Sequence, residues 1–174
     1  MTVHISDPRT DPRGLNELEP LWRELHRHHL EVSDYRPLLE DCDASWANRL
    51  GRYRELLADG ASYVTATDDG DRLVGYAMVA LDAGPDDTFV VEGGRAKVVT
   101  LVVSPDRRSA GVGRLLIAAA ESIARDHGFD TVNIGVMSGN ARALAFYEAN
   151  GYSVAEHLLS RRLEPPLDEH RPGG

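Results

Sequence analysis

The chain has 174 residues, of which 42% are hydrophobic and 27% are charged, and these proportions are typical of one globular domain with its own core. No apolar run reaches the roughly 18 residues that a membrane helix needs, no signal peptide is evident at the start, and one cysteine excludes a disulfide framework, so we expect a cytoplasmic protein without a membrane partner. The net charge is −9 and no basic patch with interleaved aromatic residues occurs, which argues against a nucleic-acid partner.

The first third of the chain is predicted to hold a short strand and two helices. The strand covers Val3–Ile5, and the residues 7–14 that follow are rich in Pro, Asp and Arg, which predicts a loop. Apolar residues then recur at helical spacing over residues 15–32. The same spacing predicts a second helix over about residues 45–58, with Asp43 as its candidate cap.

The period then changes from helical to that of strands. Residues 62–67 and 73–81 flank an Asp-Gly turn, and because such a turn tolerates positive φ angles, the pair is predicted to be a β-hairpin. An irregular stretch follows over residues 84–94. Residues 96–103 form a nearly continuous apolar run, which is expected of a strand buried on both faces.

The last part of the chain alternates helices and strands. It is predicted to hold a helix over residues 112–127, a strand over 131–136, a helix over 140–151, mostly strand over 152–163, and a disordered tail over 164–174. One domain therefore covers residues 1–163. The order β-α-α-β-β-β-α-β-α-β combines a hairpin with a later βαβ pair, which predicts an α/β (α+β) fold with a central mixed sheet and helices on both faces.

One segment points to an anion site. Residues 103–116 read as the end of a buried strand, a turn and the start of a helix. The first turn of a helix has unpaired backbone N–H groups and the positive end of the helix dipole, and together these bind phosphate groups. Gly111 and Gly113 lack a Cβ atom, so a ligand can approach the backbone closely. Positive charge around the same turn comes from Arg107, Arg108 and Arg114.

The spacing of glycine and basic residues in this segment indicates which kind of phosphate ligand it suits. A P-loop needs Gly-x-x-x-x-Gly-Lys-Ser/Thr, and the segment has no such lysine. A dinucleotide-binding turn needs Gly-x-Gly-x-x-Gly, but Leu116 occupies the position of the third glycine. The pattern that remains is Arg108-x-x-Gly111-x-Gly113 between a buried strand and an amphipathic helix, and it suits a diphosphate.

From about residue 97 to residue 163 the sequence resembles the GCN5-related N-acetyltransferase (GNAT) family. Three blocks in the family's order carry the resemblance: Leu101-Val102-Val103-Ser104-Pro105, Arg108-Ser109-Ala110-Gly111-Val112-Gly113, and Asn140-x-x-Ala143-x-x-Phe146-Tyr147-x-x-x-Gly151-Tyr152. The resemblance implies the GNAT fold and an N-acetyltransferase that uses acetyl-CoA as co-substrate, without a metal. The acceptor is then an amine of a small molecule or peptide.

The resemblance also implies roles for individual residues. Tyr147 matches the family's common general acid, which protonates the leaving CoA thiolate, although the Phe146-Tyr147 pair could also be simple helix packing. The backbone near Val103 is placed to donate an N–H to the tetrahedral oxyanion. The residues implied to bind the cofactor are Leu101, Val102, Val103, Arg108, Ser109, Ala110, Gly111, Val112, Gly113, Arg114, Asn140 and Ala143.

No general base is evident from the motifs. Some family members carry a glutamate near the start of the buried strand, but residues 96–98 here are Ala, Lys and Val. Glu92 in the preceding irregular stretch is the candidate catalytic base, and a water relay is the alternative. Ser109 and Ala110 stand where the family often has glycine, which need not abolish binding because the donors are backbone groups.

Histidines and the cysteine offer further chemistry. His26, His28 and His29 lie on the first predicted helix. His26 and His29 share a face, but a metal site there lacks a third ligand. Because the first two helices of the GNAT fold border the acceptor site, we expect these histidines at the surface or in the acceptor cleft. Cys42 lies between two aspartates, which raise the pKa of a thiol, so direct transfer is favoured over an acyl-cysteine intermediate.

The charge distribution bears on the acceptor. Residues 1–96 hold 19 acidic and 10 basic residues, a balance of −9, whereas residues 97–174 hold 9 of each. The acidic half indicates a cationic amine as acceptor, or else a surface that only maintains solubility. The alternative function is a catalytically weak CoA-binding sensor or partner protein with the same fold. Members of the family commonly dimerise, so a homodimer is a further hypothesis.

Overall fold

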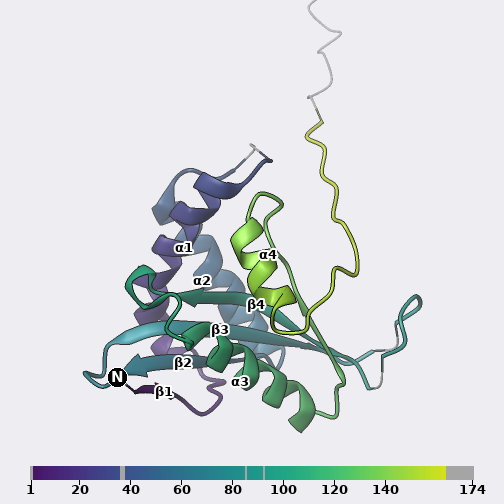
Figure 1. The fold of residues 1–174 in the computed structure, drawn as a ribbon, viewed down its shortest axis with the longest axis horizontal. Coiled ribbons are helices and arrows are strands. Elements are labelled where there is room, and N and C mark those ends of the chain that lie inside the picture. The colour runs from purple at the N-terminus through teal and green to yellow at the C-terminus, as the bar shows by residue number, and fades with distance from the viewer. Residues whose placement is uncertain (1, 36–37, 85, 92, 164–174) are drawn as a thin grey trace, which may run out of the picture.

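The part of the chain that the structure describes forms a single mixed sheet of five strands. The computed structural model describes residues 2–35, 38–84, 86–91 and 93–163. The strands lie in the order β1 (Val3–Ile5), β2 (Ser62–Asp68), β3 (Leu73–Asp82), β4 (Arg95–Val103) and β5 (Thr131–Ile134). Strands β1 to β4 pair with one another in antiparallel orientation, whereas β5 pairs with β4 in parallel. The predicted mixed sheet is therefore confirmed (Figure 1).

Helices cover both faces of this sheet, as the element order predicts. They are the 3-10 helix η1 (Pro12–Leu18), α1 (Glu19–Val32), α2 (Cys42–Ala58), the short 3-10 helix η2 (Pro105–Arg107), α3 (Val112–Asp126) and α4 (Ala141–Glu148). In Figure 1, α3 lies on one face and α1 and α2 lie on the other. The Phe146 ring of α4 lies against Gly113 at the start of α3. No helix in the described ranges is long and apolar enough to cross a membrane.

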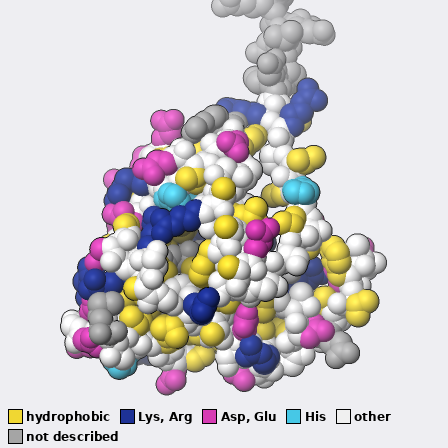
Figure 2. Space-filling view, viewed as in Figure 1, with side chains coloured by type: hydrophobic (Ala, Val, Ile, Leu, Met, Phe, Trp, Pro, Cys, Tyr) yellow, Lys and Arg dark blue, Asp and Glu magenta, His cyan; other side chains and the backbone are white. Residues whose placement is uncertain are grey.

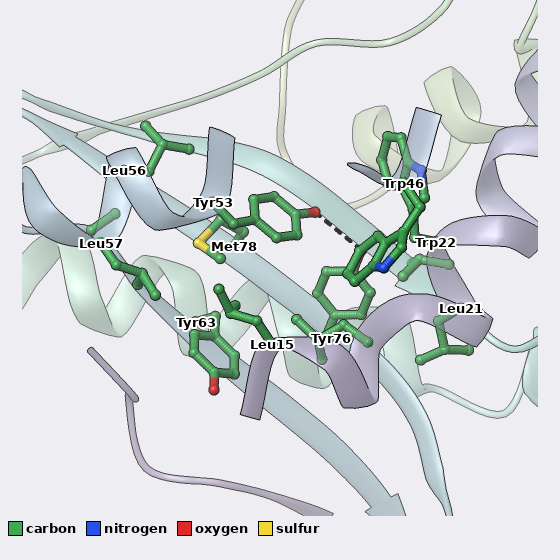
Figure 3. Packing of buried hydrophobic residues seen from close by; sticks show 13 residues of the cluster. Leu15, Leu21, Trp22, Trp46, Tyr53, Leu56, Leu57, Tyr63, Tyr76 and Met78 are labelled. Carbon is green, nitrogen blue, oxygen red and sulfur yellow. Dashed lines mark hydrogen bonds between the residues drawn. The ribbon is translucent and has the colours of Figure 1, made fainter. Parts of the chain in front are cut away.

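Each face of the sheet has its own hydrophobic core. The core under α3 is mainly aliphatic and includes Val98, Leu116 and Ile123. The core under α1 and α2 is rich in aromatic side chains: Trp22, Trp46, Tyr53, Tyr63 and Tyr76 (Figure 3). Burial of these apolar side chains on two faces holds the sheet rigid between the helices, and the site described below is built at the ends of its strands.

Several predicted boundaries are wrong, and local hydrogen bonds explain why. The predicted loop over residues 7–14 gives way to η1, because the side chain of Asp11 caps it by accepting from the backbone N of Arg13. α2 begins earlier than expected, because Asp41 rather than Asp43 is its cap and accepts from the backbone N of Asp43 and Ala44. β5 ends at Ile134, two residues early.

The strand predicted over residues 152–163 is not formed. Tyr152 is held by a hydrogen bond from its backbone N to the Tyr147 carbonyl oxygen. The following residues, up to 163, make no hydrogen bond that the structure records, and Leu158 and Leu159 are 93% and 89% exposed. A strand needs a hydrogen-bonded neighbour, and alternating apolar residues alone do not supply one. The tail predicted for residues 164–174 lies outside the described residues.

A bulge in β4 changes which face its side chains occupy. Met78 pairs with Thr100 and Val79 pairs with Val98, so Val99 is the extra residue of a β-bulge. After the bulge, Val102 packs into the core under α1 and α2, whereas Val98 before it belongs to the core under α3. On its other side, β4 pairs with β5 only as far as Val98. The two strands then separate, which leaves a wedge beside the last residues of β4.

Candidate active site

The turn between β4 and α3 presents a row of unpaired amides. α3 follows Gly111, whose φ is +84°, and Ser109 also has a positive φ of +66°. The backbone N–H groups of Ser109, Gly111, Val112 and Gly113 donate to no acceptor within the described chain. Successive amides around left-handed residues form an anion-binding concavity, and the N-terminal end of the α3 dipole adds to it. This geometry can hold a phosphate group.

The two glycines of this turn are required for different physical reasons. A Cβ added to Gly111 would meet no atom within 4 Å, so the requirement there is the left-handed φ together with open space above the backbone. A Cβ added to Gly113 would lie 3.0 Å from the Phe146 ring. Gly113 therefore lets α4 approach α3 closely, which is a packing role that the sequence did not predict.

Arg107 anchors the loop that carries these amides. Its Nη2 lies 3.1 Å from Oδ2 of Asp68, whose Oδ1 also accepts from the backbone N of Gly70 and Arg72. The hydrogen bond from Arg107 is the main reason that the pKa of Asp68 lies below its ordinary value. Arg72 pairs in addition with Asp106 on the loop itself, at 2.7 Å. The β2–β3 turn and the β4–α3 loop are thus tied together.

Other arginines around the turn are left without a carboxylate. Arg108, Arg114 and Arg142 form no ion pair with any described residue. Nε of Arg108 lies 3.5 Å from the Val103 carbonyl oxygen, and Nη2 of Arg142 lies 3.5 Å from Oγ of Ser109. Figure 2 shows dark blue side chains gathered where Figure 1 draws the loop after β4. Uncompensated guanidinium groups beside free amides are the charge that a polyanion requires.

A cavity of about 270 Å³ joins this loop to the end of β4, to α1 and to α4. Most of the residues predicted for the site line it: Leu101, Val102, Val103, Arg108, Ser109, Gly111, Gly113, Arg114, Asn140, Ala143 and Tyr147. Ala110 is exposed, and the Val112 side chain is buried in the core under α3, so neither side chain lines the cavity. Glu92 lies outside the described residues. The structure thus gathers three separated motifs around one space.

Some residues of the lining were not predicted from the sequence as binding residues. Leu25 and His28 come from α1, and Arg107, Arg142 and Phe146 come from the elements that carry the motifs. Arg142 could have been predicted from the sequence. A basic residue in the first turn of a helix is repelled by the positive end of the helix dipole, and an anionic partner offsets this repulsion. Leu25 looks like any other apolar residue of an amphipathic helix.

Tyr147 is placed by α4 at the inner wall of the cavity. The helix starts there because Oδ1 of Asn140 caps it, accepting from the backbone N of Ala143 at 3.1 Å. The Tyr147 ring packs against Phe146 and Tyr152 with centroid distances of 5.3 and 5.8 Å. Burial, and secondarily Tyr152, raises the pKa of Tyr147 well above its ordinary value. The hydroxyl therefore keeps its proton at neutral pH, as a proton donor must.

The three histidines of α1 have three different environments. His26 is buried, and its Nδ1 lies 3.1 Å from Oγ of Ser45, which accepts a hydrogen bond from Nε1 of Trp22. His29 packs edge-on against Trp22, and burial lowers its pKa to about 4. His28 alone of the three lines the cavity. Within the described ranges, no group of three or more His, Cys, Asp or Glu side chains is placed to hold a metal.

The comparison with known families decides the assignment of this fold. The model of the acetyltransferase (GNAT) family matches residues 17–152. This chain belongs to the GNAT acetyltransferase family. The match covers α1 to α4 and strands β2 to β5, so it includes every described element of the candidate site.

Individual relatives of the GNAT chain agree with this. The mycothiol acetyltransferase of Clavibacter sepedonicus is 35% identical over 104 residues, which are 60% of this chain and 31% of that protein, so the chain spans about a third of that relative. A GCN5-related N-acetyltransferase from Ralstonia eutropha JMP134 superposes with a TM-score of 0.72 at 15% identity, covering 92% of this chain and 99% of that one. AAC(6')-Iy, in complex with the bisubstrate analogue CoA-S-monomethyl-acetylneamine, superposes with a TM-score of 0.66 at 16% identity, over 95% and 100%. At such identities, the two structures show the fold alone.

Proposed function

We propose that this protein transfers the acetyl group of acetyl-CoA directly to an amine of a small molecule or peptide. The observation that carries the proposal is that Ser109, Gly111 and Gly113, whose amides are unpaired within the described chain, line the same cavity as Tyr147 and the free end of β4. An anion cradle, an unpaired strand end and a proton donor are what a CoA thioester requires of a transferase. The bisubstrate complex of AAC(6')-Iy supports CoA as the donor on this fold.

In this proposal different groups of the protein bind different parts of the acetyl-CoA molecule. The amides of the β4–α3 turn, with Arg108, Arg114 and Arg142, hold the diphosphate. The last residues of β4 have no partner strand on the β5 side, so their backbone can pair with the amides of the pantetheine arm as an added strand would. A backbone N–H near Val103 stabilises the tetrahedral oxyanion. The transfer is direct, because Cys42 does not line the cavity.

The proposed chemistry ends at Tyr147. The amine nitrogen attacks the thioester carbon, the C–S bond breaks, and the leaving thiolate takes the phenolic proton of Tyr147. Replacing Tyr147 by Phe should lower kcat by about 10²-fold or more, whereas the Kd of CoA should hardly change because the cradle is untouched. Tyr63→Phe is the matched control, since Tyr63 is buried in the core and does not line the cavity. An unchanged kcat would remove Tyr147 from the acid role.

For the acceptor we propose a cationic amine. The end of α1, the connection that follows and the start of α2 carry exposed acidic side chains: Glu31, Asp34, Glu40, Asp41 and Asp43. In Figure 2 magenta side chains lie along this edge of the molecule, where Figure 1 draws the start of α2. Attraction to such a rim weakens with added salt. Equal kcat/KM for neutral and polycationic amines, without salt dependence, would count against this acceptor class. A cytoplasmic location and a homodimer stay predictions.

Two measurements on the wild-type protein separate the proposed enzyme from the alternative of a CoA-binding sensor. Calorimetric titration with CoA tests the cradle, and thiol release from acetyl-CoA over a panel of amines tests turnover. Binding together with amine-dependent thiol release supports the transferase. Binding without thiol release on any amine would favour the sensor, and the absence of binding would reject both.

A further inference from the structure

Acetyl transfer to an amine needs a group that accepts a proton, and the described lining of the cavity contains one. No Asp, Glu or Cys occurs among the described residues that line it. The arginines of the lining are permanently protonated, and Tyr147 keeps its proton because of burial. Asn140 and Ser109 are too weakly basic to serve. The remaining titratable side chain of the lining is the imidazole of His28.

His28 is held in place by its own helix. It lies one turn after Leu25, which lines the same cavity, so this face of α1 is directed at the site. Its side chain is 24% exposed, and its Nδ1 lies 3.7 Å from Oε2 of Glu31, one turn further along. At this distance the two groups make no hydrogen bond, but the negative charge on the Nδ1 side favours the tautomer with a proton on Nδ1. That tautomer leaves on Nε2 the lone pair that a general base uses.

The neighbouring histidines cannot take this role. The Nδ1 of His26 is engaged with Ser45 inside the core. His29 packs on Trp22 and does not line the cavity. The charged groups that share the described cavity lining with His28 are Arg107, Arg108, Arg114 and Arg142, and Glu31 lies beside His28 on its own helix. Arg107 is already paired with Asp68, and a bound diphosphate would compensate Arg108.

We propose that His28 is the general base of the reaction, an inference that rests on the proposed transferase function. As the amine nitrogen attacks the thioester carbon, Nε2 of His28 takes the proton that this nitrogen loses. The new C–N bond forms, the C–S bond breaks, and the thiolate takes the proton of Tyr147. The proton on the imidazolium then returns through water to the Tyr147 phenolate. A neutral amine and acetyl-CoA are thereby converted into the acetylated amine and CoA thiol without a net change in protons.

The test compares matched histidine variants with the wild-type protein. His28→Gln should lower kcat by about 10²-fold or more, while the Kd of CoA measured by calorimetry stays unchanged, because the cradle does not depend on α1. His29→Gln, one residue along the same helix, should keep the wild-type kcat. In His28→Ala, added imidazole should restore part of the lost kcat, and it should restore nothing in Tyr147→Phe. A residue that only supports the fold would not be replaced by free imidazole.

Each contrary outcome has its own meaning. A wild-type kcat in His28→Gln, or a loss in His28→Ala that imidazole does not relieve, would overturn the role of His28 and leave the proposed function intact. A lost kcat in Glu92→Gln beside full activity in His28→Gln would also overturn it, and would favour the base expected from the sequence. If the wild-type protein binds CoA but releases no thiol with any amine, the proposed function and the role of His28 fail together.

Discussion

Removing the hydroxyl of Tyr53 should destabilise the fold more than removing that of Tyr76, although both changes are Tyr→Phe in the same core. Tyr53 and Tyr76 are fully buried, and Thr100 is nearly so. The Tyr53 hydroxyl donates to Oγ1 of Thr100 at 2.6 Å. It also lies 3.0 Å from the Tyr76 hydroxyl (Figure 3). Because Tyr53 has one hydroxyl hydrogen and gives it to Thr100, Tyr76 must donate to the Tyr53 oxygen.

The expected loss of stability in each variant follows from the number of hydrogen bonds that break and of buried hydroxyls left without a partner. Tyr53→Phe breaks both hydrogen bonds and leaves the hydroxyls of Tyr76 and Thr100 buried without this partner, at about 1–3 kcal/mol each, so it should lower the free energy of unfolding by about 2–6 kcal/mol. Tyr76→Phe breaks one bond, and the Tyr53 hydroxyl still donates to Thr100, so the loss should be about 0.5–1.5 kcal/mol. In the double variant no Tyr76 hydroxyl is left unsatisfied, so it should cost no more than Tyr53→Phe alone.

Urea unfolding, followed by circular dichroism, measures these free energies if the slope with urea is the same for all variants. Tyr35→Phe is the control on a Tyr that is 39% exposed, and it should change the free energy by less than about 0.5 kcal/mol. Equal losses in Tyr53→Phe and Tyr76→Phe, or additive losses in the double variant, would refute the proposed direction of donation. The outcome matters for the site, because Thr100 follows the bulge that turns the end of β4 toward the cavity.

Two other predictions concern loop anchoring and pH. Asp68→Asn should raise the Kd of CoA several-fold in calorimetry, because Arg107 loses the nearer of its two carboxylate partners and the cradle loop is held less firmly. Asp69→Asn on the same turn should leave the Kd unchanged. Stability should fall as pH drops from about 6.5 toward 4, because burial keeps His29 neutral in the fold (pKa about 4) while the unfolded chain takes up the proton near 6.5. The free energy of unfolding, measured with urea, should fall by about 2–3 kcal/mol across this pH range. In His29→Gln this fall should disappear, and the same fall in that variant would contradict its assignment to His29.

The fold could be predicted from the sequence wherever the determining interactions are local. Helical spacing, the Asp-Gly turn and the glycine-punctuated start of α3 involve residues close together in the chain, so the order of elements and the anion cradle were predicted. Strand pairing depends on distant residues, and it is there that the prediction failed. The alternation of apolar residues over 152–163 does not tell whether another strand lies close enough to pair with this segment. The bulge at Val99 likewise follows from the competition between two cores, one on each face of β4.

The same limit explains why the sequence could not separate the three histidines of α1. Successive residues of a helix turn by about 100°, so His28 lies on a different face of α1 from His26 and His29, which are one turn apart. Which one faces the cavity depends on how α1 is rotated on the sheet, and that rotation is set by Leu21 and Trp22, which are buried against α2 and the strands. Burying this stripe takes His26 into the core beside Ser45 and leaves Leu25 and His28 at the edge of the cavity. The candidate base is thus positioned by core packing two turns earlier, and a substitution that rotates α1 should impair transfer without touching any residue of the cradle.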